Sequence, residues 1–242
     1  NLVADDGIPF RRPAGHGSLL VNLNDIDADV VLIKNIDNIQ HISKSKASND
    51  TWKLLMGTLE QFQTELKELR ENYSDSRFAE LNEKYKFIAP NEKLSKELLE
   101  TLATRPTRVC GMVLNEGAPG GGPFWIEKSG ELTKQIVEKV QISTAEDQQR
   151  IMTESSHFNP VMIVASKNDL DGNRLDLHAF SHDEQYLVVK KPFNGKTIYY
   201  RELPGLWNGG MYYWNSLFVE IPSEVFSPVK TVLDLTASEH LE

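Results

Sequence analysis

The sequence predicts an α/β fold with a mixed, mainly parallel sheet and a helical insertion. Helical periodicity dominates residues 40–105, whereas short apolar or alternating runs that are typical of strands dominate the rest of the chain. The continuous run Val-Val-Leu-Ile at residues 30–33 is typical of a strand buried on both faces in a parallel sheet. The chain therefore divides into three predicted parts, residues 1–39, 40–105 and 106–242.

The helical insertion rests on two stretches of apolar spacing. In residues 52–69, apolar side chains recur at alternating steps of three and four, and Asn49 or Asp50 can cap the start. A second helix is expected over residues 91–103, and it ends before Pro106. The apolar face of each helix indicates packing on a core. The alternative is that this face contacts a partner or a second helix of a coiled coil.

The remaining elements are expected to be strands. Asn194-Gly195 predicts a hairpin turn between two of them, and a glycine-rich loop at residues 117–123 separates two others. The expected strands lie at residues 108–114, 124–127, 160–166, 175–180, 186–189, 197–202, 218–221 and 229–235.

Composition indicates an ordinary folded protein. Of the 242 residues, 40% are hydrophobic and 25% are charged. The net charge of −9 argues against general nucleic-acid binding, which relies on a basic surface. No apolar run reaches the ~18 residues of a membrane span. Cys110 is the single cysteine and cannot form an intramolecular disulfide, so we expect a reducing, cytoplasmic compartment.

Two segments near the start of the chain can carry chemistry. Residues 13–17, Pro-Ala-Gly-His-Gly, contain Gly15 and Gly17, which let a backbone lie against a flat ring or a phosphate. Residues 35–38, Asn-Ile-Asp-Asn, place Asp37 after a predicted strand, where a carboxylate can hold Mg²⁺ that bridges phosphate oxygens. Taken alone, each segment is more often a turn or a helix cap.

Two later segments add polar groups. In residues 203–211, the amide of Asn208 offers a donor and an acceptor to a sugar hydroxyl; a tight loop with Trp207 in the core is the alternative. In residues 226–235, Lys230 lies between a proline and an apolar run, where its ammonium can meet a phosphate. A solvated surface lysine is the alternative there.

Together these segments resemble the eukaryotic-type UDP-sugar pyrophosphorylases and UTP-glucose-1-phosphate uridylyltransferases. That family carries Pro-Pro-Gly-His/Asn-Gly-Asp and then a strand ending in Asn-x-Asp-Asn, which residues 13–18 and 35–38 match in order. Its block Val-Pro-Arg-x-Arg-Phe-x-Pro-Val-Lys-Thr-x-x-Asp-Leu is followed closely at residues 221–235, the most specific match. Residues 203–211 occupy the place of Leu-Glu-Thr-Ala-x-Gly-Ala-Ala. Residues 115–125 also resemble an uncharacterised bacterial domain-of-unknown-function family, which looks distantly related to these pyrophosphorylases.

The resemblance implies a nucleotide-diphospho-sugar transferase (GT-A-like) fold and a uridylyl transfer. A sugar 1-phosphate oxygen would attack the α-phosphorus of UTP and release pyrophosphate, which needs positioning and charge neutralisation more than covalent help. Residues 1–39 would bind the nucleotide and metal, and residues 106–242 the sugar. The implied roles are uracil contact for Gly15, His16 and Gly17; catalysis and Mg²⁺ binding for Asp37; catalysis for Lys230; and sugar or phosphate contact for Asn38, Asn208, Gly209 and Gly210.

Two departures from the family pattern matter. Ser223 and Val225 stand where the family has arginines, which puts local phosphate or carboxylate contacts in doubt. The family's N-terminal glycine-rich loop is not found, and Arg11-Arg12 lacks the glycines of a phosphate cradle. We therefore expect the chain to be the C-terminal portion of a longer parent and to be inactive alone.

Two other functions stay open at this stage. One is a sugar-nucleotide-binding protein that has lost turnover, and the other is a metal-dependent glycosyltransferase of the same fold that uses Asp37 to hold the metal of its donor. The sequence chooses neither the sugar, nor UTP over other nucleotides, nor an oligomeric state.

Other site chemistry has little support in the sequence. One cysteine and six histidines form no zinc pattern, and His178 and His182 lie in a stretch expected to be strand and loop. Residues 167–173 superficially resemble a calcium loop but lack its terminal Glu, so a turn is expected. Neither Ser166 nor Ser216 has a Gly-x-Ser-x-Gly context.

Overall fold

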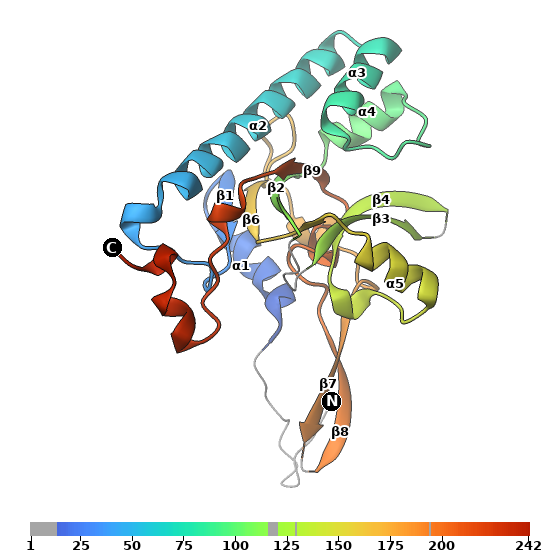
Figure 1. Ribbon diagram of the computed structural model, residues 1–242. Coiled ribbons are helices and arrows are strands. Elements are labelled where there is room, and N and C mark those ends of the chain that lie inside the picture. The colour runs from blue at the N-terminus through green and yellow to red at the C-terminus, as the bar shows by residue number, and fades with distance from the viewer. Residues whose placement is uncertain (1–13, 116–120, 129, 194) are drawn as a thin grey trace.

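A computed structural model describes residues 14–115, 121–128, 130–193 and 195–242 of the chain (Figure 1). The α-helices of this part are α1 Leu19–Asp25, α2 Lys46–Glu71, α3 Asp75–Tyr85, α4 Lys96–Ala103 and α5 Glu146–Thr153. Its strands are β1 Val30–Lys34, β2 Thr107–Leu114, β3 Gly122–Lys128, β4 Glu131–Val137, β5 His157–Phe158, β6 Met162–Ser166, β7 Leu187–Phe193, β8 Lys196–Glu202 and β9 Asn215–Glu220.

The central sheet has five strands and is mostly antiparallel. Its order is β1–β6–β2–β5, and β9 also pairs with β2. The pairs β1–β6, β2–β6 and β2–β5 are antiparallel, and β2–β9 is the single parallel pair among the described strands. The α/β class and the mixed sheet are thus confirmed, but the prediction of a mainly parallel sheet is wrong.

Strand β1 shows why that prediction failed. Its apolar run predicts burial on both faces, but the strand lies at the edge of the sheet, and Leu32 is 50% exposed. Its register against β6 runs from Val30 opposite Ser166 to Lys34 opposite Met162. The direction of a strand depends on which distant segment pairs with it, and a local apolar run does not encode that partner.

Two apolar cores lie on the two faces of the sheet, because side chains alternate along each strand. On β2, Val109 and Val113 belong to the core under α2, whereas Cys110 and Met112 belong to the core on the opposite face, which also takes side chains from α1. In Figure 1 the long helix α2 lies across the sheet with α3 and α4 at one of its ends. The apolar side chains that α2 buries are Leu55, Leu59, Phe62, Leu66 and Leu69.

The predicted helices are confirmed with shifted ends. The stripe at residues 52–69 lies within α2. The second predicted helix is α4, which begins at Lys96 instead of residue 91. The Ser95 hydroxyl caps it by accepting a hydrogen bond from the Leu98 amide at 3.2 Å. Helix α3 lies between them and was not located from the sequence. The hydroxyl of Ser74 caps it by accepting from the Arg77 amide at 3.3 Å.

The hairpin predicted from Asn194-Gly195 is confirmed as β7–β8, with a positive φ of 70° at Gly195 that favours glycine. The strands predicted at residues 175–180 and 229–235 are wrong, and Val232–Thr236 form a 3₁₀ helix in place of the second. Residues Leu177–Phe180 form a 3₁₀ helix, and the Asp176 carboxylate caps it by accepting from the His178 amide at 3.1 Å. Apolar and polar residues alternate at 175–180 as in a strand, but the carboxylate of Asp176 caps a helix.

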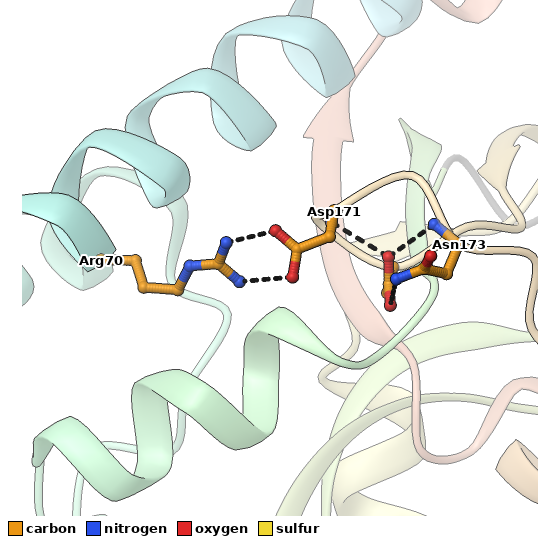
Figure 2. A network of polar contacts seen from close by, with 4 residues as sticks. Arg70, Asp171 and Asn173 are labelled. Atoms are coloured by element: carbon orange, nitrogen blue, oxygen red, sulfur yellow. Dashed lines mark hydrogen bonds and ion pairs between the residues drawn. The ribbon is translucent and has the colours of Figure 1, made fainter.

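The loop that resembles a calcium site is a turn closed by Asp169, as expected. Its Oδ1 accepts the backbone amides of Asp171 at 3.0 Å and Asn173 at 2.8 Å, and its Oδ2 accepts from the Asn173 side chain at 3.0 Å. Figure 2 shows Asp171 meeting the guanidinium of Arg70 from α2. Both carboxylates are therefore used within the chain, and the loop is tied to α2.

Some predictions fall outside this description. Pro13, residues 116–120 of the glycine-rich loop, and Asn194 lie outside the described residues. The division of the chain at residues 39 and 105 stays a prediction. Among the described residues, no helix is both long enough and apolar enough to cross a membrane.

Candidate functional site

The structure brings Asp37 and Lys230 together although 193 residues separate them in the sequence. The segments that carry them pair through a bridge between Asn38 and Pro228, and the backbone amide of Val229 donates to the Asp37 carbonyl at 2.7 Å. Lys230 Nζ forms an ion pair with Asp37 Oδ2. The Lys230 side chain is 66% exposed and that of Asp37 is 24% exposed, so the pair is open to solvent on the lysine side.

Asn38 holds these two segments together. It is buried, its Nδ2 donates to the carbonyl of Val225 at 3.1 Å, and its Oδ1 accepts from the amide of Ser227 at 2.9 Å. Both ends of its amide are thus occupied by the C-terminal segment. Asn38 fixes the backbone that presents Asp37, and its contact with a sugar or nucleotide stays a prediction.

Asp234 supports the backbone at Lys230, and the sequence reasoning did not single it out. Its Oδ2 accepts from the backbone amides of Thr231 at 2.6 Å and Lys230 at 2.8 Å. These bonds lower the pKa of Asp234, that from Thr231 most, because they stabilise the carboxylate. The signal was present in the sequence, since Thr231 and Asp234 have the spacing of a capping box.

His16 packs on the loop that follows β8. Its ring stacks on the ring of Trp207 with centroids 4.0 Å apart and planes 13° apart. The backbone amide of Leu206 donates to His16 Nδ1 at 3.0 Å. A ring nitrogen that accepts a hydrogen bond carries no proton, so this geometry corresponds to a neutral imidazole protonated at Nε2.

The two glycines beside His16 approach the same loop closely. A Cβ atom at Gly15 would overlap the Glu202 carboxylate, and one at Gly17 would overlap the Pro204 carbonyl. The protein's own backbone and side chains thus account for both glycines. Their contact with uracil stays a prediction.

Asn208, Gly209 and Gly210 are buried inside this loop. Asn208 Nδ2 donates to the Ile136 carbonyl of β4 at 2.8 Å, and the Gly210 amide donates to the Gly205 carbonyl at 2.9 Å. Asn208 Oδ1 is buried and has no hydrogen-bond partner among the described residues. The geometry closes the loop against β4, and the predicted sugar contacts of the three residues stay predictions.

The predicted residues therefore form two clusters, the Asp37–Lys230 pair and the His16–Trp207 stack. Within the described part of the chain, no hydrogen bond or ion pair links one cluster to the other. No group of three or more His, Cys, Asp or Glu side chains in that part is placed to hold a metal ion. A single carboxylate is still compatible with Mg²⁺, which commonly keeps several waters and binds one or two carboxylates plus substrate phosphates.

Acid is expected to destabilise the protein in part through His16. Burial lowers the pKa of His16 below its ordinary value of 6.5. Below that pH the unfolded chain binds more protons than the folded one, so stability that is present above pH 6.5 is lost as the pH falls through the folded pKa. We expect the melting temperature of His16→Gln to fall less than that of the wild type between about pH 7 and pH 5. Parallel curves for the two proteins would contradict this role.

Comparison with known proteins identifies a family. The family described as "Domain of unknown function (DUF4301)" matches residues 2–241 of the chain. No curated protein matches the chain. Solved structures that are similar to it include two mutants of UDP-glucose pyrophosphorylase from Leishmania major, one in complex with UDP-glucose, and a UDP-glucose phosphorylase from Trypanosoma brucei.

The structural likeness is distant, and the chain spans less than half the length of each of these proteins. The UDP-glucose complex is 16% identical over 60% of this chain and 33% of its own, with a TM-score of 0.34. The other Leishmania structure is 15% identical over 97% and 45%, with a TM-score of 0.43. The Trypanosoma structure is 21% identical over 59% and 32%, with a TM-score of 0.36.

Proposed function

The chain belongs to the DUF4301 family, and from its site we propose that it forms the sugar- and metal-binding side of a nucleotidyltransferase cleft. The reaction is transfer of a uridylyl group from UTP to a sugar 1-phosphate, with release of pyrophosphate. Its ligands are UTP with a sugar 1-phosphate in one direction and a nucleotide sugar in the other. The motif resemblance supports this proposal, and so does the meeting of Asp37 with Lys230.

The single observation that carries the proposal is a carboxylate beside an ammonium, on two segments that the chain brings together from its opposite ends. Asp37 is the residue that would hold Mg²⁺, which neutralises phosphate charge when bound. Lys230 offers its ammonium to the phosphoryl group as a point charge. Uridylyl transfer needs this kind of charge neutralisation and alignment, and it needs no covalent help from the protein.

The ion pair itself is compatible with ligand binding. Lys230 and Asp37 neutralise each other in the free protein, so a phosphate has to share or replace the Asp37 carboxylate. Since the lysine is 66% exposed, the pair contributes at most ~1 kcal/mol and can be exchanged at small cost. Meanwhile Asn38 and Asp234 hold the two backbone segments in place.

A second candidate is a sugar-nucleotide-binding protein without turnover. Val225 and Ser223 occupy the places where the resembling family has arginines, and Val225 is fully buried. This part of the site therefore offers no cation to a phosphate. A glycosyltransferase that uses Asp37 to hold the metal of a bound donor is the third candidate, and the assays below separate it from the other two.

We expect Asp37→Ala and Lys230→Ala each to weaken binding of Mg²⁺-UTP or of a UDP-sugar by about 10- to 100-fold. Loss of one charge-assisted contact costs ~1.5–3 kcal/mol, which corresponds to this change in affinity. Isothermal titration calorimetry on the purified chain measures the effect. In a longer parent that carries a glycine-rich loop, both variants should also abolish UTP-dependent pyrophosphate release.

Lys67→Ala is the matched control, because Lys67 is an exposed lysine on α2. It should bind like the wild type. If a panel of UDP-sugars, UTP and Mg²⁺ neither binds the chain nor raises its melting temperature, all three candidates fail. Binding without pyrophosphate release or sugar transfer favours the binding protein, and sugar transfer to an acceptor favours the glycosyltransferase.

A further inference from the structure

A separate pocket lies between the β3–β4 hairpin and strands β2, β5 and β9. Its volume is about 350 Å³, near the lower end of the ~300–1,000 Å³ that is usual for small-molecule pockets. Its walls include the rings of Phe124, Trp125 and Phe218 and the polar side chains of Lys134, His157 and Glu220. None of its lining residues belongs to the Asp37–Lys230 pair or to the His16–Trp207 stack.

Lys134 is the cation of this pocket. Alternation along β4 directs Gln135 to the Tyr212 carbonyl, which its Nε2 contacts at 2.8 Å, and directs Lys134 to the other side of the strand. Lys134 Nζ lies 5.5 Å from the centroid of the Trp125 ring and 5.1 Å from that of Phe218. Both distances allow cation–π attraction. Burial lowers the pKa of Lys134 to about 8.

No carboxylate of the described residues forms an ion pair with this ammonium. Besides burial, the charges that act on its pKa are those of Cys110, Arg108 and Lys86, and the two cations lower it further. Burial raises the pKa of Cys110 to about 11, so its thiol is neutral near pH 7 and supplies no counter-charge. A partly desolvated ammonium without an anion is costly, and an anionic ligand would relieve that cost.

The lining of the pocket also includes a hydrogen-bonded pair. His157 Nε2 lies 3.0 Å from Glu220 Oε2, and His157 Nδ1 lies 2.8 Å from the Ser156 hydroxyl. The Glu220 side chain is 65% exposed, which places it at the solvent side of the pocket. Its negative charge disfavours a ligand with more than one negative charge, because the described lining residues include one lysine, Lys134, to offset it.

We propose that this pocket binds a small carboxylate that carries one flat apolar ring. The carboxylate pairs with Lys134, and the ring packs on the aromatic side chains of Trp125 and Phe218. A phosphate dianion fits less well, because it needs more donors than one ammonium provides and meets Glu220 at the rim. The alternative is that Lys134 only covers aromatic surface with its stem, in which case no anion is needed.

Isothermal titration calorimetry of the whole chain with benzoate tests the proposal. We expect saturable binding of benzoate, and at least about 10-fold weaker binding of benzyl alcohol, which has the same ring without the charge. Lys134→Met keeps the length and apolar stem of the side chain and should lose benzoate binding by at least about 10-fold. Lys67→Met, which changes an exposed lysine of α2, should leave benzoate binding unchanged.

A second measurement separates a binding role from a merely structural one. After reductive ¹³C-methylation of the lysines, NMR follows the pKa of the Lys134 amine, and benzoate should raise it because an anion favours the charged form. Equal benzoate binding by Lys134→Met, or neither saturable binding nor a shift of the Lys134 signal, would overturn the proposal. Neither readout depends on UTP or a UDP-sugar, so failure of the pocket proposal can be distinguished from failure of the proposed function.

Discussion

Phe62→Ala is expected to lower the free energy of unfolding by about 3–5 kcal/mol. Phe62 lies in the middle of α2, is fully buried and belongs to the core between this helix and the sheet. Its ring makes edge-to-face contacts with Tyr85 and Phe87, at centroid distances of 5.1 and 4.9 Å. Truncation removes buried apolar surface and leaves a cavity that the helix and sheet cannot close completely. Urea denaturation measures the loss.

The matched control for this experiment lies on the same helix. Lys67→Ala changes an exposed position, replaces a good helix former by another, and should alter stability by less than about 0.5 kcal/mol. If Phe62→Ala cost no more than this control, α2 would not be packed on the sheet as described. The two variants together therefore test the main packing contact of residues 40–105.

Local signals were sufficient for the elements whose structure is decided locally. The α2 stripe is a repeat within one helix, and the adjacent residues Asn194-Gly195 in the sequence predict a hairpin, so both α2 and the β7–β8 pair were predicted correctly. Strand direction is different. β1 takes its direction from β6, which lies more than a hundred residues later in the chain, and the apolar run of β1 contains no information about that pairing.

The candidate site shows the same limit. Residues 35–38 and 226–235, read alone, predict two turns, and only the family resemblance placed Asp37 and Lys230 in one site. The stacking of His16 on Trp207 was missed because neither residue has a local pattern that points to the other. Asp234 was missed although its capping box with Thr231 is visible in the sequence.

Arg108 was also missed, although it is the most demanding side chain of the core. It opens a predicted strand, and the sequence gives no reason to expect an arginine buried there. Its guanidinium donates to Ser216 Oγ at 2.7 Å, to the Trp207 carbonyl at 2.6 Å and to Gln135 Oε1 at 3.3 Å. These partners come from three distant segments, so the fold has to form before the charge is satisfied.

Arg108→Lys is expected to destabilise the protein by about 3–5 kcal/mol, and Arg108→Met is expected to destabilise it less. Arg108 is fully buried, its partners are neutral, and burial lowers the pKa of its guanidinium. Lysine keeps the buried charge, but its single ammonium cannot reach the three acceptors that the planar guanidinium of arginine contacts. Methionine removes the charge and fills most of the volume, so its main cost is three acceptors without a donor.

The order of the two variants decides which effect dominates at this position. Urea denaturation near neutral pH measures both, and a methionine variant less stable than the lysine variant would show that the unpaired acceptors cost more than the unpaired charge. Arg108 donates a hydrogen bond to the Trp207 carbonyl. Either variant should therefore also weaken the packing of the Trp207 ring, on which His16 stacks. A wild-type-like pH dependence of stability in Arg108→Met would show that this stack stands without the buried arginine.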